Sequence, residues 1–361
     1  MGPRTGRLVI IVGVMACGRS GFDPQRDERE DASDGSDAGD AACTNALAYD
    51  SVGDGGALAP YLICNAAQWV DIVAHPESWG ASFKLAADID LSSIPPPHHA
   101  IGTYVPLAPF TGVMDGDRHV VLNFTNAAAG SYFGLFGHVS GAQAEIKNIA
   151  LVDAQLWTGP QAGALVGYLE QGTVRNAAVI GSNCYTRSTG YANHRGTLIG
   201  ETRPGSVVVD VFGSCAIDGN GGGVGGLIGH HEGSVTNCYY QHAGIVTDNG
   251  GNYVGGLVGW NTGPGSIANC FANVDVHGNN TGTVGLLVGT GTAPNNSYYA
   301  ANRTCTNDGG ACNSYGTGID LVTTPDYFSR KANPPLTSWD FTAVWAERTN
   351  SEPVLAWMLA F

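Results

Sequence analysis

The amino-acid sequence predicts an all-β fold, a parallel β-solenoid (β-helix) of coils of about 30 residues with a cap at each end. The first observation is composition, since 53 of the 361 residues are glycine and 13% are charged. This glycine content disfavours a helical bundle, because each interior glycine costs a helix roughly 1 kcal/mol. The second observation is an internal repeat. The third is that Gly, Asn and Asp turns separate its short β-rich pieces.

Residues 1–16 have the pattern of a secretory signal peptide. Arg4 and Arg7 precede an apolar run from Leu8 to Ala16, which is far shorter than the roughly 20 residues that span a bilayer. The run ends in Val14-Met15-Ala16-Cys17, which resembles the bacterial lipobox. This resemblance implies a diacylglycerol on the Cys17 thiol, cleavage before Cys17 and acylation of the new amine. The alternative is an ordinary signal peptide followed by an incidental cysteine.

Residues 17–42 are expected to form an acidic, disordered tether. The segment is rich in Asp, Glu, Gly, Ala and Ser, and Phe22 is its one aromatic residue. Such a composition cannot bury enough apolar surface to fold, and its charges repel one another, so the chain stays extended. The order of ligands typical of an EF-hand is absent, which favours a solvated spacer over a Ca²⁺ loop.

Both ends of a solenoid need covers, because an open end exposes a strand edge. Residues 43–100 are expected to form the N-terminal cap and the first coils, with a short helix over Gln68–Val73. Residues 301–361 are expected to form the C-terminal cap, in which three tryptophans cover the last coil. They are Trp339, Trp345 and Trp357.

Residues 101–300 contain the repeat. Six tetrapeptides with a central Leu and a final Gly recur at intervals of about 30 residues. Their final glycines are Gly137, Gly167, Gly200, Gly229, Gly259 and Gly289. The Leu is expected to point inward, while the glycines let the backbone turn without a Cβ clash. Strands of successive windows are therefore expected to stack about 4.8 Å apart.

A second element follows most copies of the tetrapeptide and ends in an asparagine two residues after a Val or Ile. These asparagines should align as an amide ladder along the stack and satisfy turn backbone groups. They are Asn148, Asn176, Asn237, Asn269 and Asn296. Asp210 stands where Asn is expected, and the interval before Gly200 is the longest. We therefore expect a small insertion or bulge in that coil.

Together, the two elements resemble the GLUG-motif repeats of bacterial secreted and surface proteins. The similarity extends to Lys84–Leu91 and Pro109–Gly116, which look like leading coils, and to Trp339–Phe341 and Pro353–Leu355, which look like the closing segment. The resemblance implies a solenoid on cell surfaces, sometimes beside a peptidase or adhesin domain. It implies no catalytic residues.

Nine cysteines would leave one thiol over in an oxidising compartment, and assigning Cys17 to lipid leaves eight. Cysteines at matching phase in adjacent coils have Cα atoms about 5 Å apart, within disulfide range. Buried free thiols or a Cys₄ zinc site are the alternatives, although no C-x-x-C spacing occurs. The predicted pairs are Cys184–Cys215, Cys238–Cys270, Cys43–Cys64 and Cys305–Cys312.

A search for catalytic motifs finds no GxSxG, HExxH or Walker sequence. Solenoid enzymes that cleave polysaccharides need carboxylates, or Arg and Lys, clustered on one outer face. Asp88 with Asp90 and Asp115 with Asp117 are alternate residues that could share a face. Since Asp115-Gly116 is also a plain turn signal, we expect no catalytic pair and no cofactor.

The residue after each final glycine is a candidate for ligand binding. Equal phase places one such side chain per coil in a row, expected to be exposed, where aromatic and polar groups could recognise a glycan. The row is His138, Tyr168, Glu201, His230, Trp260 and Thr290. The alternative is a turn position that tolerates any residue. Glu201 with His230 and His231 offers too few ligands, so we expect no metal.

These observations predict a non-catalytic lipoprotein, exported and anchored to the outer membrane or cell surface, that presents a β-solenoid for adhesion or for glycan or matrix binding. Its partners would be the membrane, through the lipid on Cys17, and a glycan or surface protein. The formal net charge of -15 excludes nucleic acid as a partner. The alternative is a carbohydrate-active enzyme, a polysaccharide lyase or glycoside hydrolase, on the same scaffold.

Overall fold

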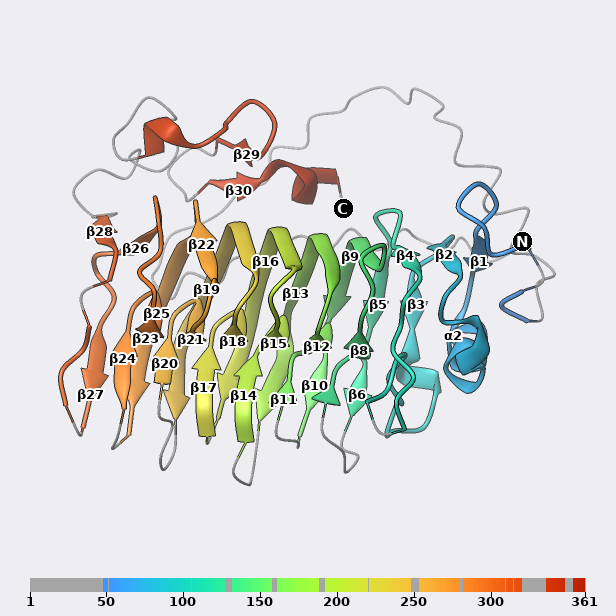
Figure 1. Ribbon diagram of the computed structural model, residues 1–361, viewed down its shortest axis with the longest axis horizontal. Coiled ribbons are helices and arrows are strands. Elements are labelled where there is room, and N and C mark those ends of the chain that lie inside the picture. The colour runs from blue at the N-terminus through green and yellow to red at the C-terminus, as the bar shows by residue number, and fades with distance from the viewer. Residues whose placement is uncertain are drawn as a thin grey trace, which may run out of the picture.

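Parallel strands of successive sequence windows lie directly on one another and form a β-solenoid, as predicted (Figure 1). This computed structural model describes residues 48–50, 52–104, 106–126, 132–157, 161–187, 192–219, 221–247, 253–279, 282–308, 310–313, 315–319, 336–347 and 353–360. The predicted signal peptide, the tether, Cys17 and Cys43 lie outside these residues. No helix in the described ranges has the length and apolar character needed to cross a bilayer.

The largest of the three stacked sheets, the main sheet, holds the long strand of each coil. Its central path is β1 (Tyr61–Ile63), β2 (Ser82–Leu85), β4 (Val113–Asp115), β9 (Glu145–Val152), β13 (Gly172–Arg187), β16 (Ser206–Asp218), β19 (Ser234–Thr247), β23 (Phe271–Gly278), β26 (Tyr298–Ala300) and β28 (Thr317–Ile319). Short strands join it beside this path: β3 (Ile89–Asp90), β5 (Val120–Leu122), β6 (Thr125–Asn126), β10 (Gln155–Leu156), β22 (Ser266–Ala268) and β27 (Cys305–Asn307).

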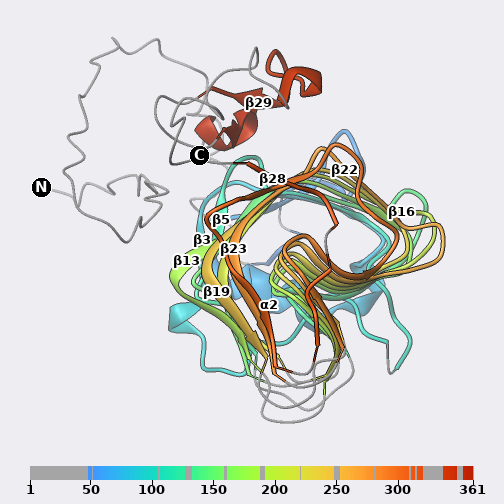
Figure 2. The same cartoon turned by 90° about the vertical axis from the view of Figure 1, so that its left-hand side faces the viewer.

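Two six-stranded sheets complete the coils. The second sheet contains β7 (Tyr132–Phe133), β11 (Gln161–Ala162), β14 (Ala192–Gly196), β17 (Gly221–Gly225), β20 (Tyr253–Gly255) and β24 (Thr283–Gly285). The third sheet contains β8 (Phe136–Val139), β12 (Val166–Leu169), β15 (Ile199–Thr202), β18 (Ile228–His231), β21 (Val258–Asn261) and β25 (Val288–Gly291). Figure 2 looks along the stack and shows successive coils superposed on one another.

A sharp bend between the second and third sheets holds the central leucine of each tetrapeptide. All six leucines are fully buried in the core, as predicted: Leu135, Leu165, Leu198, Leu227, Leu257 and Leu287. The final glycine lies where the two sheets approach most closely. A Cβ on Gly167 would lie 2.6 Å from Phe133 N, and one on Gly200 would lie 2.7 Å from Ala162 N. Real side chains do not tolerate such distances to backbone, so glycine is required there.

A second corner carries the predicted amide ladder. Asn148, Asn176, Asp210, Asn237, Asn269 and Asn296, here called the Asn corner, all have a positive φ of 44° to 55°. Nδ2 of Asn176 donates to Oδ1 of Asn148 at 3.0 Å, and Nδ2 of Asn237 donates to Oδ1 of Asp210 at 2.8 Å. Asn and Asp tolerate this left-handed backbone better than other residues with a side chain. The conformation therefore explains why the position recurs.

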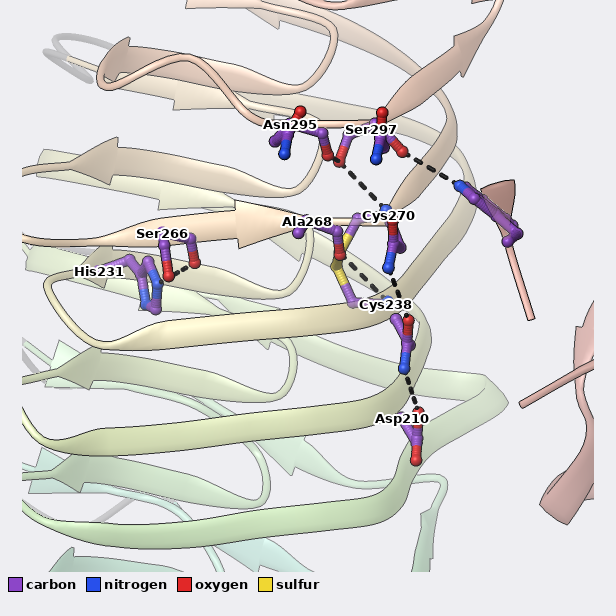
Figure 3. Close-up of a disulfide and its surroundings, with 12 residues drawn as sticks. Asp210, His231, Cys238, Ser266, Ala268, Cys270, Asn295 and Ser297 are labelled. Atoms are coloured by element: carbon purple, nitrogen blue, oxygen red, sulfur yellow. Dashed lines mark hydrogen bonds between the residues drawn. A yellow bond between two sulfur atoms is a disulfide. The ribbon is translucent and has the colours of Figure 1, made fainter. Parts of the chain in front are cut away.

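Three of the predicted disulfides are present. Their Cα–Cα distances are 5.0 Å for Cys184–Cys215, 4.5 Å for Cys238–Cys270 and 6.2 Å for Cys305–Cys312. The first two join neighbouring coils, and Figure 3 shows Cys238–Cys270 beside the ladder residue Asp210. Cys64 is also disulfide-bonded, while its predicted partner Cys43 lies outside the described residues. Disulfides are typical of an oxidising compartment outside the cytoplasm.

The predicted irregularity lies in the coil before Gly200. The pairing of β13 with β16 shifts register between Ile180 and Tyr185. Cys184 lies within this shift, so the additional residues are accommodated as a bulge.

One helix, α2 (Ala66–Ala74), lies at the N-terminal end of the stack (Figure 1). It covers the predicted range Gln68–Val73, and the Asn65 side chain caps it by accepting a hydrogen bond from Gln68 N at 3.0 Å. Trp69, 2% exposed, and Ile72, fully buried, join the solenoid core. The helix therefore covers this end of the core.

The described residues 336–347 and 353–360 pack on the flank of the stack, whereas the prediction placed the three tryptophans over the last coil. The main sheet presents an apolar stripe on its outer face, and Trp339, Trp345 and Leu355 are buried against it. The stripe includes Phe212, Tyr239, Phe271 and Tyr298. The antiparallel pair β29 (Trp345–Ala346) and β30 (Val354–Leu355) lies beside the coils in Figures 1 and 2. Trp357 packs against the same cluster.

Candidate functional site

The outer side of the bend between the second and third sheets brings the predicted row together. Parallel pairing places His138, Tyr168, Glu201, His230, Trp260 and Thr290 opposite one another in successive coils. The predicted one-residue-per-coil register is therefore correct. A matching column in the second sheet consists of Tyr132, Gln161, His194, Gly223, Tyr253 and Thr283. We call these two columns the bend face.

The prediction that the row is exposed is wrong for four of its members. His138 is 0% exposed, Glu201 1%, His230 4% and Tyr168 7%. Their neighbours explain this burial, because side chains of the second sheet lie against them. The Tyr132 ring stacks on Tyr168 at 4.6 Å between centroids, and the His194 ring lies 4.6 Å from that of His230. Trp260 and Thr290 are partly exposed.

Aromatic rings dominate the N-terminal half of the bend face. His138 stacks on Tyr168 at 5.1 Å, and Tyr104, which is 44% exposed, packs edge-on against Tyr132 at 4.9 Å. His138 Nε2 lies 2.9 Å from a carboxylate oxygen of Glu170. Burial raises the pKa of Tyr132 to about 12, so its hydroxyl stays protonated. This half offers ring faces and neutral hydroxyls.

Histidines and a carboxylate occupy the middle of the bend face. His194 Nδ1 lies 2.9 Å from Glu201 Oε2, and His230 Nδ1 lies 3.8 Å from Glu201 Oε1. Burial alone would raise the pKa of Glu201, but the contacts from both histidines and the charge of Arg203 outweigh it and lower this pKa to about 2. Glu201 is therefore a buried carboxylate that stays ionised.

Arg203 connects the two halves. Its Nη2 lies 2.7 Å from Glu201 Oε1, its Nη1 lies 3.1 Å from Glu232 Oε2, and its Nε donates to the Tyr168 hydroxyl at 3.3 Å. The Arg203 side chain is 40% exposed, so the guanidinium reaches the surface over buried partners. Sequence reasoning missed this residue. It could have been found from its position two residues after Glu201, because alternate side chains of a strand point to the same side.

The metal grouping considered from the sequence contains the wrong second histidine. His231 follows His230 directly and so points to the other face of β18. Its Nδ1 lies 2.7 Å from Thr202 Oγ1, and its Nε2 lies 3.1 Å from the Ser266 carbonyl oxygen (Figure 3). His194 takes its place beside Glu201 and His230, and ligand atoms of these three residues all lie within 4.8 Å of one another.

The carboxylate pairs considered for catalysis have structural partners. Asp88 Oδ1 lies 3.2 Å from His119 Nδ1, and Asp90 Oδ1 accepts from Ser92 N at 2.9 Å. Asp115 Oδ1 accepts from Asn148 Nδ2 at 2.9 Å and so begins the amide ladder. Asp117 pairs with Lys84 at 2.8 Å.

Comparisons with known proteins agree with this architecture. The family model described as the GLUG motif matches residues 250–276. Over 183 residues, 49% of this chain, the sequence is 32% identical to Halomucin of Haloquadratum walsbyi, and the match spans 2% of that protein's length.

A solved structure shares the fold. It is described as "a putative immunoglobulin A1 protease from Bacteroides ovatus", with a TM-score of 0.64 and 21% identity over 84% of this chain and 94% of that one. The similarity at this identity concerns the fold alone. The chain is thus a parallel β-solenoid that carries the GLUG motif, as its repeats predicted.

Proposed function

We propose that this protein is a non-catalytic surface lipoprotein that binds glycans along the bend face. The observation that carries the proposal is the continuous set of stacked rings and polar groups that runs across successive coils, from Tyr104 to Trp260. Sugar rings present flat apolar faces and hydroxyl edges. Aromatic faces next to charged hydrogen-bonding groups complement both properties.

Exposed side chains that border the bend face support this role. Tyr104 is 44% exposed, and the side chains of Glu170 and Arg203 are 47% and 40% exposed. Neighbouring side chains hold each of them: the partly exposed Tyr132 packs on Tyr104, and the buried His138 and Glu201 contact Glu170 and Arg203. A ligand would therefore meet side chains that have already lost much of their rotamer freedom, which lowers the entropic cost of binding.

A glycan array with the intact protein tests the proposal. Replacing Tyr104 and Trp260 with alanine removes ring faces at the two ends of the site, and we expect at least tenfold weaker binding. Trp157→Ala is the matched control, because Trp157 is a 38% exposed aromatic residue that contacts Tyr185 outside the bend face. Unchanged binding in the double variant, or equal loss in the control, contradicts the proposal.

We propose that the protein is not catalytic because the carboxylates considered for catalysis already have structural roles. Asp88, Asp90, Asp115 and Asp117 each serve a turn, a cap, the ladder or an ion pair. Incubation of the protein with acidic and neutral polysaccharides should release no new reducing ends and no unsaturated products. Release of either would favour the alternative, a carbohydrate-active enzyme.

We propose a lipid anchor on the Cys17 thiol, and the proposal is supported by the apolar run that precedes this cysteine. Expression in a bacterial host with a labelled fatty acid should label the wild-type protein and leave Cys17→Ser unlabelled and free in the aqueous phase. Equal labelling of both proteins would contradict the anchor.

A further inference from the structure

Three side chains from two sheets converge in the middle of the bend face. His194 comes from β14 in the second sheet, and Glu201 and His230 come from β15 and β18 in the third sheet. Their ligand atoms all lie within 4.8 Å of one another. Because His194 is seven residues before Glu201 and His230 is in the next coil, no short sequence motif signals this group. The bend alone creates it.

The group is enclosed by protein. The side chain of Glu201 is 2% exposed, that of His230 5% and that of His194 13%. The Trp260 ring stacks on the His230 ring at 4.6 Å, and Tyr253 lies 5.2 Å from Trp260. The site therefore has an apolar wall on the side of the next coil and opens toward His194.

The hydrogen bonds around His230 orient its other ring nitrogen. The Thr262 hydroxyl donates to Glu232 Oε1 at 3.4 Å, so its oxygen is free to accept from His230 Nε2–H at 2.7 Å. In a neutral imidazole, Nδ1 then carries a lone pair, and this buried atom has no hydrogen-bond partner among the described residues. It faces the Glu201 carboxylate, 3.8 Å from Oε1, the oxygen that Arg203 also contacts. A cation held by the other oxygen, Oε2, could accept this lone pair and so satisfy the buried nitrogen.

We propose that His194, Glu201 and His230 form a binding site for a divalent transition metal, with Zn²⁺ as the reference ion. Two imidazole nitrogens and one carboxylate oxygen are the ligand set of three-ligand zinc sites, which leave a fourth position open. Bonds of about 2.0–2.1 Å place tetrahedral ligands roughly 3.3–3.5 Å apart. The observed separations are 2.9 Å from His194 Nδ1 to Oε2 and 3.8 Å from His230 Nδ1 to Oε1. They end on different oxygens of Glu201, so the site requires side-chain rotations that bring His230 Nδ1 toward the ion held by Oε2.

Neighbouring groups fit the roles that surround metal ligands. Thr262 holds His230 by the nitrogen that does not face the site, which fixes ring orientation. Arg203 Nη2 lies 2.7 Å from Glu201 Oε1 and would remain paired with that oxygen while Oε2 binds the ion. The cation next to the site also weakens binding, because it repels the metal, and it favours a borderline ion that binds nitrogen over a hard ion that depends on charge alone.

Titration of the intact, untagged protein with ZnCl₂ after treatment with EDTA tests this proposal. We expect one equivalent to bind, and Co²⁺ to give the visible absorption of a tetrahedral site. His230→Gln and His194→Gln should each weaken Zn²⁺ binding by about 10–100-fold or more. His119→Gln is the matched control, because His119 Nδ1 pairs with Asp88 at 3.2 Å in a partly exposed pair away from the bend face. The affinity of this variant for Zn²⁺ should equal that of the wild type.

Thermal unfolding separates loss of metal from loss of fold. The wild type and His194→Gln should have similar midpoints in EDTA, and Zn²⁺ should raise the midpoint of the wild type only. If His230→Gln does not fold, the less buried His194 still provides the test. If the wild type binds no Zn²⁺, or if both variants bind Zn²⁺ as tightly as the wild type, the site is overturned. The three residues are then a His–Glu–Arg ion-pair network. These measurements contain no glycan, so the result is independent of the proposed function.

Discussion

The Asn corner and the bend face are two columns with the same spacing, yet they differ in what each coil places there. The corner repeats Asn five times and Asp once, and all six residues have a positive φ. The bend face places His, Tyr, Glu, His, Trp and Thr at one register position. A backbone requirement therefore selects the residue at the corner, whereas the backbone of the bend accepts any side chain.

This difference indicates where the chain can carry specificity. At the corner, the amides of Asn148, Asn176, Asn237 and Asn269 each donate to the preceding coil, as from Asn237 to Asp210, so these positions serve the stack. At the bend, the stack depends on the buried leucine and the final glycine, and the next residue is free to vary. Under the proposed function, stability and ligand recognition would thus depend on adjacent residues of one repeat.

The largest effect is expected from breaking the bend itself. Leu227→Ala removes a fully buried side chain at the apex and should lower the free energy of unfolding by about 2–5 kcal/mol, because the tightly packed bend cannot collapse into the cavity. Thr290→Ala, in the adjacent variable column, should change it by less than about 0.5 kcal/mol. Urea denaturation of both variants checks this contrast. Equal losses would mean that the column also supports the fold.

Sequence reasoning could predict whatever depends on the period alone. Equal phase gave the parallel stacking, the Cys184–Cys215 and Cys238–Cys270 pairs and the order of the bend-face row. It could not predict that the bend-face row is buried. The angle of the bend brings side chains of the second sheet against those of the third, and the repeat period does not specify this angle. His194 and Arg203 join the site through that same angle, and no spacing in the chain encodes it.

The C-terminal segment teaches a similar lesson about tertiary packing. Its tryptophans were expected to cover the last coil, but the surface that Trp339 and Trp345 cover is the outer stripe of the main sheet. Phe212, Tyr239, Phe271 and Tyr298 form that stripe at one residue per coil. Their shared phase was a usable signal, because four large apolar side chains in an outward column need a cover.

An intermediate effect is expected at the Asn corner. Asn237 has φ of 55°, and its Nδ2 donates to Asp210 Oδ1 at 2.8 Å. Asn237→Ala should cost about 2 kcal/mol, since it loses this hydrogen bond and places Ala in the left-handed region. Asn237→Gly should recover about half of that loss, because glycine adopts this backbone freely. If both variants lose the same amount in urea denaturation, the amide and not the conformation selects Asn.

The smallest effect concerns the one position at which the corner departs from Asn. Burial raises the pKa of Asp210 above its ordinary value of 3.8, against the opposing contributions of Asn237 and Arg175. The folded state therefore binds this proton more tightly than the unfolded state, so the ionised carboxylate destabilises the fold at neutral pH and the penalty disappears as the pH falls. Asp210→Asn should then be more stable than the wild type by at most about 1 kcal/mol at pH 7.

The stability advantage of Asp210→Asn should shrink as the pH falls toward 3.8 and vanish below it, where the wild-type carboxyl becomes protonated in both states. Urea denaturation of both proteins from pH 7 to pH 3.5 measures this difference, and groups that titrate alike in both cancel. A variant that is less stable at pH 7 would show that the charge of Asp210 contributes to the corner, through Arg175 and the stronger bond from Asn237. The corner would then tolerate variation for an energetic reason, whereas the proposed function gives the bend face a reason in ligand recognition.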